Sequence, residues 1–188
     1  MNIKMLFDKF PVIDCGEFLL REITEEDEAD IFEIYSDYEN IVYDRKIPFK
    51  ELNEASEYIK RVKANYESKS SIRWAVAIKY NNKLIGIAAA NLIDATNERC
   101  NLGYILNKKY WRKGIMSSCI EKLLKIIFEE GEFHRVSAHI NPTNTASIRL
   151  INKMGFVKEG VLRDYSYNIE EDKFEDRVLY SLISHITI

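Results

Sequence analysis

Residues 110–118, YWRKGIMSS, combine an aromatic pair, two adjacent cations, a glycine and two hydroxyls. They follow the run CNLGYIL, which predicts a strand, and precede CIEKLLKIIFEE, which predicts a helix. The first backbone N–H groups of a helix lack intrahelical partners and the helix dipole is positive there, so an anion is favoured. Gly114 lets a ligand approach the backbone, and Arg112 and Lys113 add charge-assisted contacts to phosphate. The segment therefore predicts a diphosphate site, with a solvated, charged turn as the alternative.

A second segment, NPTNTASIRLINKMGF at residues 141–156, places Asn144 and Ser147 at the start of another predicted helix. An asparagine in that position ordinarily caps the helix by accepting a hydrogen bond from a free amide. A serine in the first turn is ordinarily a surface or packing residue. On local features alone, this segment predicts structure rather than chemistry.

Several other chemistries lack their motifs. The chain contains no GxxxxGK[ST], GxGxxG, HExxH or GxSxG pattern, which disfavours the cofactor and nucleophile classes tied to those motifs. The three cysteines, Cys15, Cys100 and Cys119, are odd in number and have no CxxC spacing. We therefore expect neither a disulfide framework nor a metal site.

The composition is typical of a soluble globular protein. A length of 188 residues favours a single domain, which we place at residues 1–188. The formal net charge of -3 argues against a protein dedicated to binding nucleic acid. Residues 1–16 show no long apolar region followed by a small-residue cleavage site, and no apolar run reaches about 18 residues, so we expect a cytoplasmic protein without membrane contact.

The elements that must position these residues alternate along the chain. Strands are predicted at residues 17–23, 72–80, 83–93, 99–106 and 134–140 and in a long C-terminal hairpin; helices are predicted at residues 24–35, 50–66, 118–130 and 144–154. Thr24 with Asp27, and Ser118 with Glu121, read as capping boxes, and Asn81-Asn82 predicts a two-residue hairpin loop. This order predicts an α/β protein: a mixed, mostly antiparallel twisted sheet of about seven strands, about four flanking helices and one parallel crossover.

Taken together, LGYILNKKYWRKGIMSS and INPTNTASIRLINKMGFVKEGVLRD resemble the GNAT acetyltransferase superfamily. Within it they are similar to the bacterial RimJ/RimL-type ribosomal-protein N-terminal (alanine/serine) acetyltransferases. LLREITEEDEADIFEIYSD and EDRVLYSLI also resemble that group, so the likeness runs from about Leu19 to the C-terminus. The predicted order of elements is the one this family uses, with the parallel strands 99–106 and 134–140 splayed apart. The resemblance implies acetyl-CoA as co-substrate and no metal.

The resemblance also implies a binding site for acetyl-CoA. The family's phosphate loop, Q/R-x-x-G-x-G/A, falls on residues 111–116, where Gly114 matches strictly and Met116 replaces a small residue. Amides of residues 112–117 would hold the pyrophosphate, residues 104–106 would pair with the pantetheine arm, and Asn144 would form a hydrogen bond with that arm. The implied binding residues are Tyr104, Ile105, Leu106, Trp111, Arg112, Lys113, Gly114, Ile115, Met116, Ser117 and Asn144.

The resemblance implies catalytic roles for three residues. The Leu106 amide would polarise the thioester carbonyl. Many relatives have a proton-donating tyrosine where this chain has Ile151, and the pattern N-x-x-S makes Ser147 the substitute donor. His139 stands where some relatives have a glutamate base, and an ordinary pKa near 6.5 suits that role. A structural histidine, with ordered water as the base, is the alternative; Asn101 also replaces a frequent glutamate.

We expect direct transfer of acetyl from acetyl-CoA, in a ternary complex, to the N-terminal α-amine of a protein such as a ribosomal protein. The shortage of carboxylate bases favours an α-amine, because its pKa of about 7.7–8.0 is far below the value of about 10.4 for lysine. One alternative is an acetyltransferase for a small amine, such as a polyamine or an aminoglycoside. Another is a catalytically weak, CoA-binding regulatory protein. Met116, Ile151 and Asn101 depart from the family's pattern and are compatible with this alternative.

We expect the acceptor-binding surface to come from the predicted helices 24–35 and 50–66 and the loop near residues 163–176. That surface includes NIVYDRKIPF, DATNER and RDYSYNIEEDKFED, whose acidic residues would attract a cationic peptide unless they are only solvated. Assembly of the protein into a homo-oligomer is compatible with this sequence.

Overall fold

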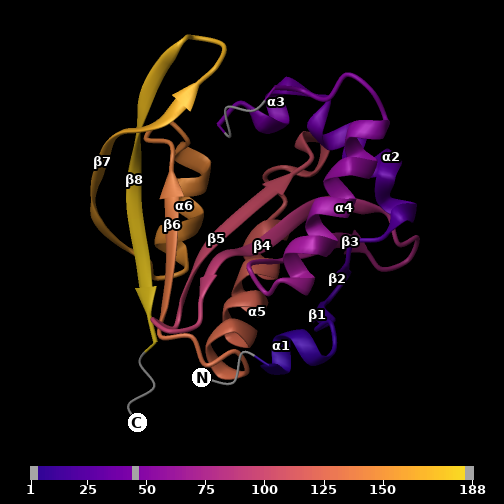
Figure 1. The fold of residues 1–188 in the computed structure, drawn as a ribbon, viewed down its shortest axis with the longest axis horizontal. Coiled ribbons are helices and arrows are strands. Elements are labelled where there is room, and N and C mark those ends of the chain that lie inside the picture. The colour runs from indigo at the N-terminus through magenta and orange to yellow at the C-terminus, as the bar shows by residue number, and fades with distance from the viewer. Residues whose placement is uncertain (1–3, 44–46, 185–188) are drawn as a thin grey trace.

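The computed structural model describes residues 4–43 and 47–184. Its elements follow one another as α1 (Lys4–Asp8), β1 (Ile13–Cys15), β2 (Phe18–Glu22), α2 (Glu28–Tyr35), α3 (Tyr38–Ile41), α4 (Asn53–Glu67), β3 (Ile72–Ile78), β4 (Leu84–Asp94), β5 (Arg99–Leu106), α5 (Ile115–Glu129), β6 (Arg135–Ile140), α6 (Thr145–Lys153), β7 (Val157–Asn168) and β8 (Lys173–Ile183) (Figure 1). Two short 3-10 helices, Glu25–Asp27 and Lys108–Tyr110, precede α2 and follow β5.

The strands form one eight-stranded sheet in the order β1-β2-β3-β4-β5-β6-β8-β7. Every neighbouring pair is antiparallel except β5 and β6, which α5 connects as a parallel crossover. The predicted α/β fold class, with its mixed sheet and four main helices, is confirmed. The eighth strand is β1, a three-residue element too short to give a periodic signal.

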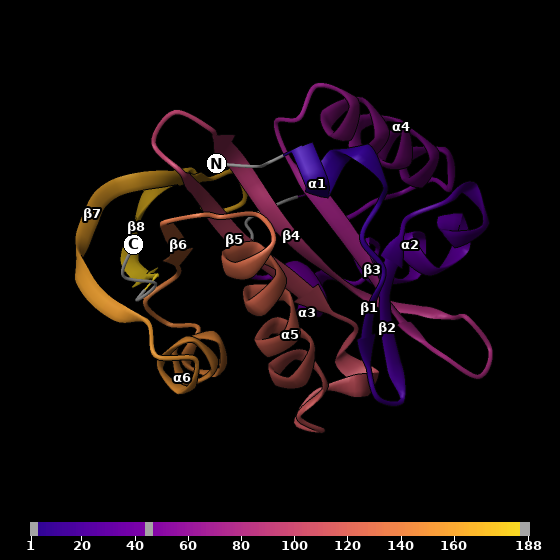
Figure 2. The ribbon, with the colours of Figure 1, turned by 90° about the horizontal axis from the view of Figure 1, so that it is seen from below.

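The helices cover both faces of the sheet: α2 and α4 lie on one face and α5 and α6 on the other (Figure 2). Each pair of helices buries its own apolar cluster against the strands. In β5, Cys100 and Leu102 belong to the cluster beneath α5 and α6, whereas Ile105 belongs to the cluster beneath α2 and α4. Because side chains alternate along a strand, even-numbered and odd-numbered residues of β5 point to opposite faces of the sheet, and the same holds for β6.

The parallel strands β5 and β6 pair only at their starts. The register joins Arg99 to Arg135, Cys100 to Val136 and Asn101 to Ser137, and ends there. Beyond Asn101, β5 stays paired with β4 as far as Leu106, while β6 follows β8. The two strands therefore diverge, which confirms the predicted splay.

Two local predictions were wrong. The helix predicted to begin at Ser118 begins at Ile115, because Gly114 takes a positive φ of 76° and caps it, so Ser118 donates its amide to Gly114 inside the helix. The two-residue loop at Asn81-Asn82 is a five-residue turn, since β3 ends at Ile78 and β4 begins at Leu84. Asn82 donates its amide back to the Ile78 carbonyl and takes a positive φ of 58°, which asparagine tolerates.

Candidate active site

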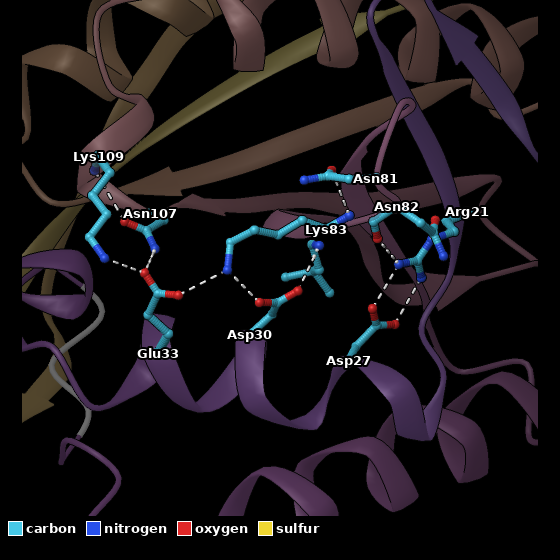
Figure 3. Close-up of polar contacts among 10 residues, drawn as sticks. Arg21, Asp27, Asp30, Glu33, Asn81, Asn82, Lys83, Asn107 and Lys109 are labelled. Carbon is cyan, nitrogen blue, oxygen red and sulfur yellow. Dashed lines mark hydrogen bonds and ion pairs between the residues drawn. The ribbon is translucent and has the colours of Figure 1, made fainter.

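A row of carboxylates on one face of α2 and the turn before it ties the sheet to that helix. Asp27 and Asp30 are spaced by one helical turn. Asp27 forms a bidentate pair with Arg21 on β2, at 2.7 and 2.8 Å, and also accepts from the Thr24 amide, as its predicted capping box requires. Asp30 accepts from the Lys83 side chain and from the Leu84 amide (Figure 3). The start of β4 is thereby fixed to α2.

Glu33, the next residue in this row, reaches the segment that follows β5 (Figure 3). Its carboxylate accepts from Lys109 at 2.6 Å, from Asn107 at 3.0 Å and from Lys83 at 3.1 Å. These contacts, with Lys109 first, lower the pKa of Glu33 from 4.5 to about 2 despite partial burial. The buried Asn107 also accepts from the Lys109 amide. Sequence analysis missed Asn107 and Glu33, although the three-residue spacing of the carboxylates on α2 was visible.

The loop at residues 111–114 joins this anchored segment to α5. The Trp111 indole donates to the Leu106 carbonyl at 2.7 Å, so the loop is held against the end of β5. Arg112 and Gly114 both have positive φ, 61° and 76°. At Gly114 the conformation itself calls for glycine, since an added Cβ would meet no atom within 4 Å. The Lys113 ammonium lies 5.4 Å from the centre of the Tyr110 ring.

The first turn of α5 fits an anionic group. Its first intrahelical bond runs from the Ser118 amide to the Gly114 carbonyl, which leaves the amides of Ile115, Met116 and Ser117 outside the helical pattern. Met116 is 6% exposed and packs into the core, so its side chain does not crowd the loop. The exposed Arg112 and Lys113 stand next to these amides. This arrangement suits a diphosphate.

The outer edge of β5 offers backbone groups to the splay. The Asn107 amide donates to the Ile85 carbonyl, and hydrogen-bonded residues alternate along an antiparallel pair. The N–H and C=O groups of Ile105 consequently face β4, whereas those of Tyr104 and Leu106 face the gap toward β6. Of residues 104–106, Tyr104 and Leu106 therefore present backbone groups to the splay, and Ile105 contributes its 8%-exposed side chain to the core beneath α2 and α4.

Ser147 and Asn144 lie across the splay on α6, on the same face of the sheet as the Tyr104 side chain. Asn144 caps α6, accepting from the Ser147 amide at 3.0 Å through Oδ1. The Ser147 hydroxyl contacts the Tyr104 hydroxyl at 2.6 Å. One turn further along α6, Ile151 is fully buried in the core. The structure thus brings Tyr104 and Ser147 together.

His139 lies on the opposite face of the sheet. Its neighbours Ala138 and Ile140 pack into the cluster beneath α5 and α6, so its own side chain points to the α2/α4 face. Nδ1 lies 3.4 Å from the Tyr165 hydroxyl of β7, and burial lowers the pKa of His139 below 6.5. Asn101 points to the same face as His139. A proton donor at Ser147 and a base at His139 would therefore approach the splay from two sides.

The α2/α4 face contains a cavity of about 230 Å3, lined by Tyr35, Phe49, Tyr58, Arg61, Val62, Asn65 and Arg73. Arg73 donates to the Tyr58 hydroxyl and to the Asn91 side chain. Asn91 in turn lies over Gly103 of β5, where an added Cβ would stand 2.8 Å from its Nδ2. These contacts connect the wall of the cavity to β4 and β5. Of the predicted acceptor loops, DATNER lies at the far end of β5 from Leu106, and residues 44–46 are outside the described residues.

The cysteines offer no nucleophile to this site. All three are buried, and burial raises the pKa of Cys100 to about 12. Within residues 4–43 and 47–184, no group of three or more His, Cys, Asp or Glu side chains could hold a metal ion. The groups that meet at the splay are hydroxyls and backbone amides.

The acetyltransferase (GNAT) domain family matches residues 17–157, three quarters of the chain. The chain belongs to the GNAT acetyltransferase family. It is 33% identical over 158 residues to the N-acetyltransferase YoaA of Bacillus subtilis, covering 84% of this chain and 89% of that protein. It is also 30% identical over 101 residues to the ribosomal protein uS5-alanine N-acetyltransferase of Escherichia coli, covering 53% and 51%.

Solved GNAT structures share the fold. A RimL ribosomal L7/L12 α-N-protein acetyltransferase in complex with coenzyme A superposes with a TM-score of 0.81 at 17% identity, over 92% of this chain and 98% of that one. The protein is therefore an acetyl-CoA-dependent GNAT N-acetyltransferase, as the sequence predicted, related at moderate identity to the RimJ/RimL type. None of the helices in the described part of the chain has the length and apolarity to cross a membrane.

Proposed function

We propose that this GNAT enzyme acetylates the N-terminal α-amine of a protein. The observation that carries the proposal is the lack of a carboxylate base among these groups: the hydroxyls of Tyr104 and Ser147 meet on one face of the sheet, and the other face carries Asn101 and His139, whose pKa burial lowers. At pH 7 an α-amine needs only about 1–1.4 kcal/mol to lose its proton, whereas a lysine ammonium needs about 4.6 kcal/mol. The similarity to the uS5-alanine enzyme over half of the chain also supports this acceptor class.

The proposed site for acetyl-CoA consists of the first turn of α5, the loop before it and the outer edge of β5. The amides of residues 112–117 would hold the pyrophosphate with Arg112 and Lys113 beside it. The outward groups of Tyr104 and Leu106 would pair with the pantetheine arm, and Nδ2 of Asn144 would donate to it. Trp111 supports this site by holding the Leu106 carbonyl.

The proposed reaction is one displacement in a ternary complex. The amine nitrogen attacks the thioester carbonyl carbon while His139, or a water beside it, accepts the amine proton. The Leu106 amide stabilises the negative oxygen. The carbon–sulfur bond then breaks, and Ser147 gives a proton to the sulfur. Positioning of amine and thioester by the two faces of the sheet would supply much of the rate.

Mass-spectrometric acetylation with acetyl-CoA tests the acceptor class. Three acceptors are compared: a basic peptide that begins with Ala or Ser, the same peptide with a blocked N-terminus and its lysines intact, and spermidine. Modification of only the free-N-terminus peptide is the expected result. Modification of spermidine alone, or of the blocked peptide at lysine, would replace the α-amine proposal by a small-amine or lysine acetyltransferase. Acetyl-CoA binding with no transfer to any amine would favour a regulatory protein.

A further inference from the structure

The phenol of Tyr104 contacts the hydroxyl of Ser147 at 2.6 Å, although the two residues are 43 positions apart in sequence. Tyr104 comes from β5 and Ser147 from the first turn of α6. The capping bond from the Ser147 amide to Asn144 fixes the position of Ser147 on the helix. Both hydroxyls therefore belong to rigid elements on the two sides of the splay.

The chemistry of the two groups favours one direction for their hydrogen bond. A phenol is a stronger donor than an aliphatic alcohol, and a serine oxygen can accept while its own proton points elsewhere. Burial raises the pKa of Tyr104 to about 12, even though the Ser147 contact lowers it, so the phenol keeps its proton throughout the physiological range. Tyr104 is thus a permanent donor.

We propose that Tyr104 is a positioning residue for acetyl transfer: its phenol donates to Ser147 Oγ and turns the serine proton toward the departing sulfur. This inference rests on the proposed role of Ser147 as the proton donor. Ile151 is fully buried where many relatives have a tyrosine on the equivalent helix, so no phenol reaches the sulfur from that position. In this chain a phenol reaches the site from β5 instead and acts through the serine.

The protons balance without a further reactant. As the carbon–nitrogen bond forms and the carbon–sulfur bond breaks, the electron pair of the latter leaves on sulfur, which takes the Ser147 proton. The phenol of Tyr104 stabilises the negative charge that develops on Ser147 Oγ. The base accepts the proton that the new amide nitrogen loses and passes it to solvent. Ser147 then regains a proton from solvent.

A double-mutant cycle on kcat tests the proposal. The variants are Tyr104→Phe, Ser147→Ala and the two together, and release of free CoA thiol from acetyl-CoA is the measured rate. Loss of one charge-stabilising hydrogen bond lowers kcat of Tyr104→Phe about tenfold, with KM for acetyl-CoA nearly unchanged. Ser147→Ala is expected to lose about a hundredfold. The double variant should be no slower than Ser147→Ala, because without the serine oxygen the phenol has nothing to act through.

Losses that multiply in the double variant would overturn the proposal, as would a Tyr104→Phe enzyme that keeps wild-type kcat or changes only KM. Ser147→Thr keeps the hydroxyl, so Tyr104→Phe should again lower kcat in that background. Tyr80→Phe is the matched control, since Tyr80 is 87% exposed on the β3–β4 turn. If the wild-type enzyme acetylates no α-amine, the proposed acceptor class fails, while the proposal for Tyr104 can still be tested. The same double-mutant cycle is then measured on hydrolysis of acetyl-CoA, because hydrolysis breaks the same carbon–sulfur bond.

Discussion

The Trp111 indole donates to the Leu106 carbonyl over 2.7 Å, and so joins the loop before α5 to the last residue of β5. The loop is the proposed pyrophosphate site, and the Leu106 amide is the proposed donor to the thioester oxygen. One side chain therefore sets the spacing between the two ends of the proposed acetyl-CoA site. The same residue of β5 uses its carbonyl for the loop and keeps its amide toward the splay.

Trp111→Phe keeps an aromatic ring but removes the donor. We expect KM for acetyl-CoA to rise about threefold to tenfold, which corresponds to one hydrogen bond, and kcat to change less. Trp74→Phe is the control, because the Trp74 indole also donates to a backbone carbonyl, that of Pro11, but is buried away from the splay. Steady-state kinetics and thermal melting should show Trp74→Phe losing stability with KM unchanged; equal KM effects in both variants would refute the role of Trp111.

Glu33→Gln should destabilise the fold at neutral pH by about 1–2 kcal/mol, a figure discounted from the pKa shift because the side chain is partly exposed. The folded-state pKa of about 2 lies below the ordinary 4.5, so the contribution of Glu33 is complete above about pH 4.5 and is lost as the pH falls toward 2. Urea unfolding at pH 7 and pH 3 should show the difference from wild type shrinking at pH 3. A stability difference that is constant with pH would argue against this contribution of the Glu33 contacts. A difference no larger than that of Glu57→Gln, whose carboxylate forms an exposed pair with Lys60, would argue against it as well.

His139 should give the pH profile its acidic limb if it is the base. Burial lowers its pKa below 6.5, so it is neutral and able to accept a proton at pH 7, and kcat/KM should fall as the pH drops through that lowered pKa. In His139→Gln this inflection should disappear together with most of the activity. His134→Gln serves as control, since His134 is exposed just before β6. An unchanged profile in His139→Gln would assign the proton to ordered water.

Two substitutions at Asn144 separate its capping role from its proposed ligand role. Asn144→Ala should cost about 1 kcal/mol of stability by removing the cap of α6. Asn144→Asp keeps the accepting oxygen, so it should restore stability, yet it lacks the Nδ2 donor and should leave KM for acetyl-CoA raised. Urea unfolding and steady-state kinetics on the same preparations distinguish the two. An aspartate variant with wild-type KM would remove Asn144 from the proposed pantetheine site.

The sequence predicted most of the fold because its long elements carry strong apolar periodicity, as in β4 and α4. It missed α1, α3 and β1, which are too short for a periodic pattern. It began α5 at Ser118 because a local capping box resembled a helix start more than the loop glycine did. The positive φ of Gly114 decides that boundary. The contact between Tyr104 and Ser147 had no local signal at all, since it depends on how two distant elements pack.

Backbone amide hydrogen exchange, measured residue by residue by NMR with and without acetyl-CoA, tests the central claim that the splay and the start of α5 form one site for acetyl-CoA. In the free protein, the amides of Leu106, Ile115, Met116 and Ser117 lie outside the regular ladders and should exchange rapidly. Acetyl-CoA should slow the exchange of all four, and leave the amides of β1 unchanged. Protection confined to another region, or unchanged exchange at Leu106 and in the first turn of α5 at saturating acetyl-CoA, would contradict the account.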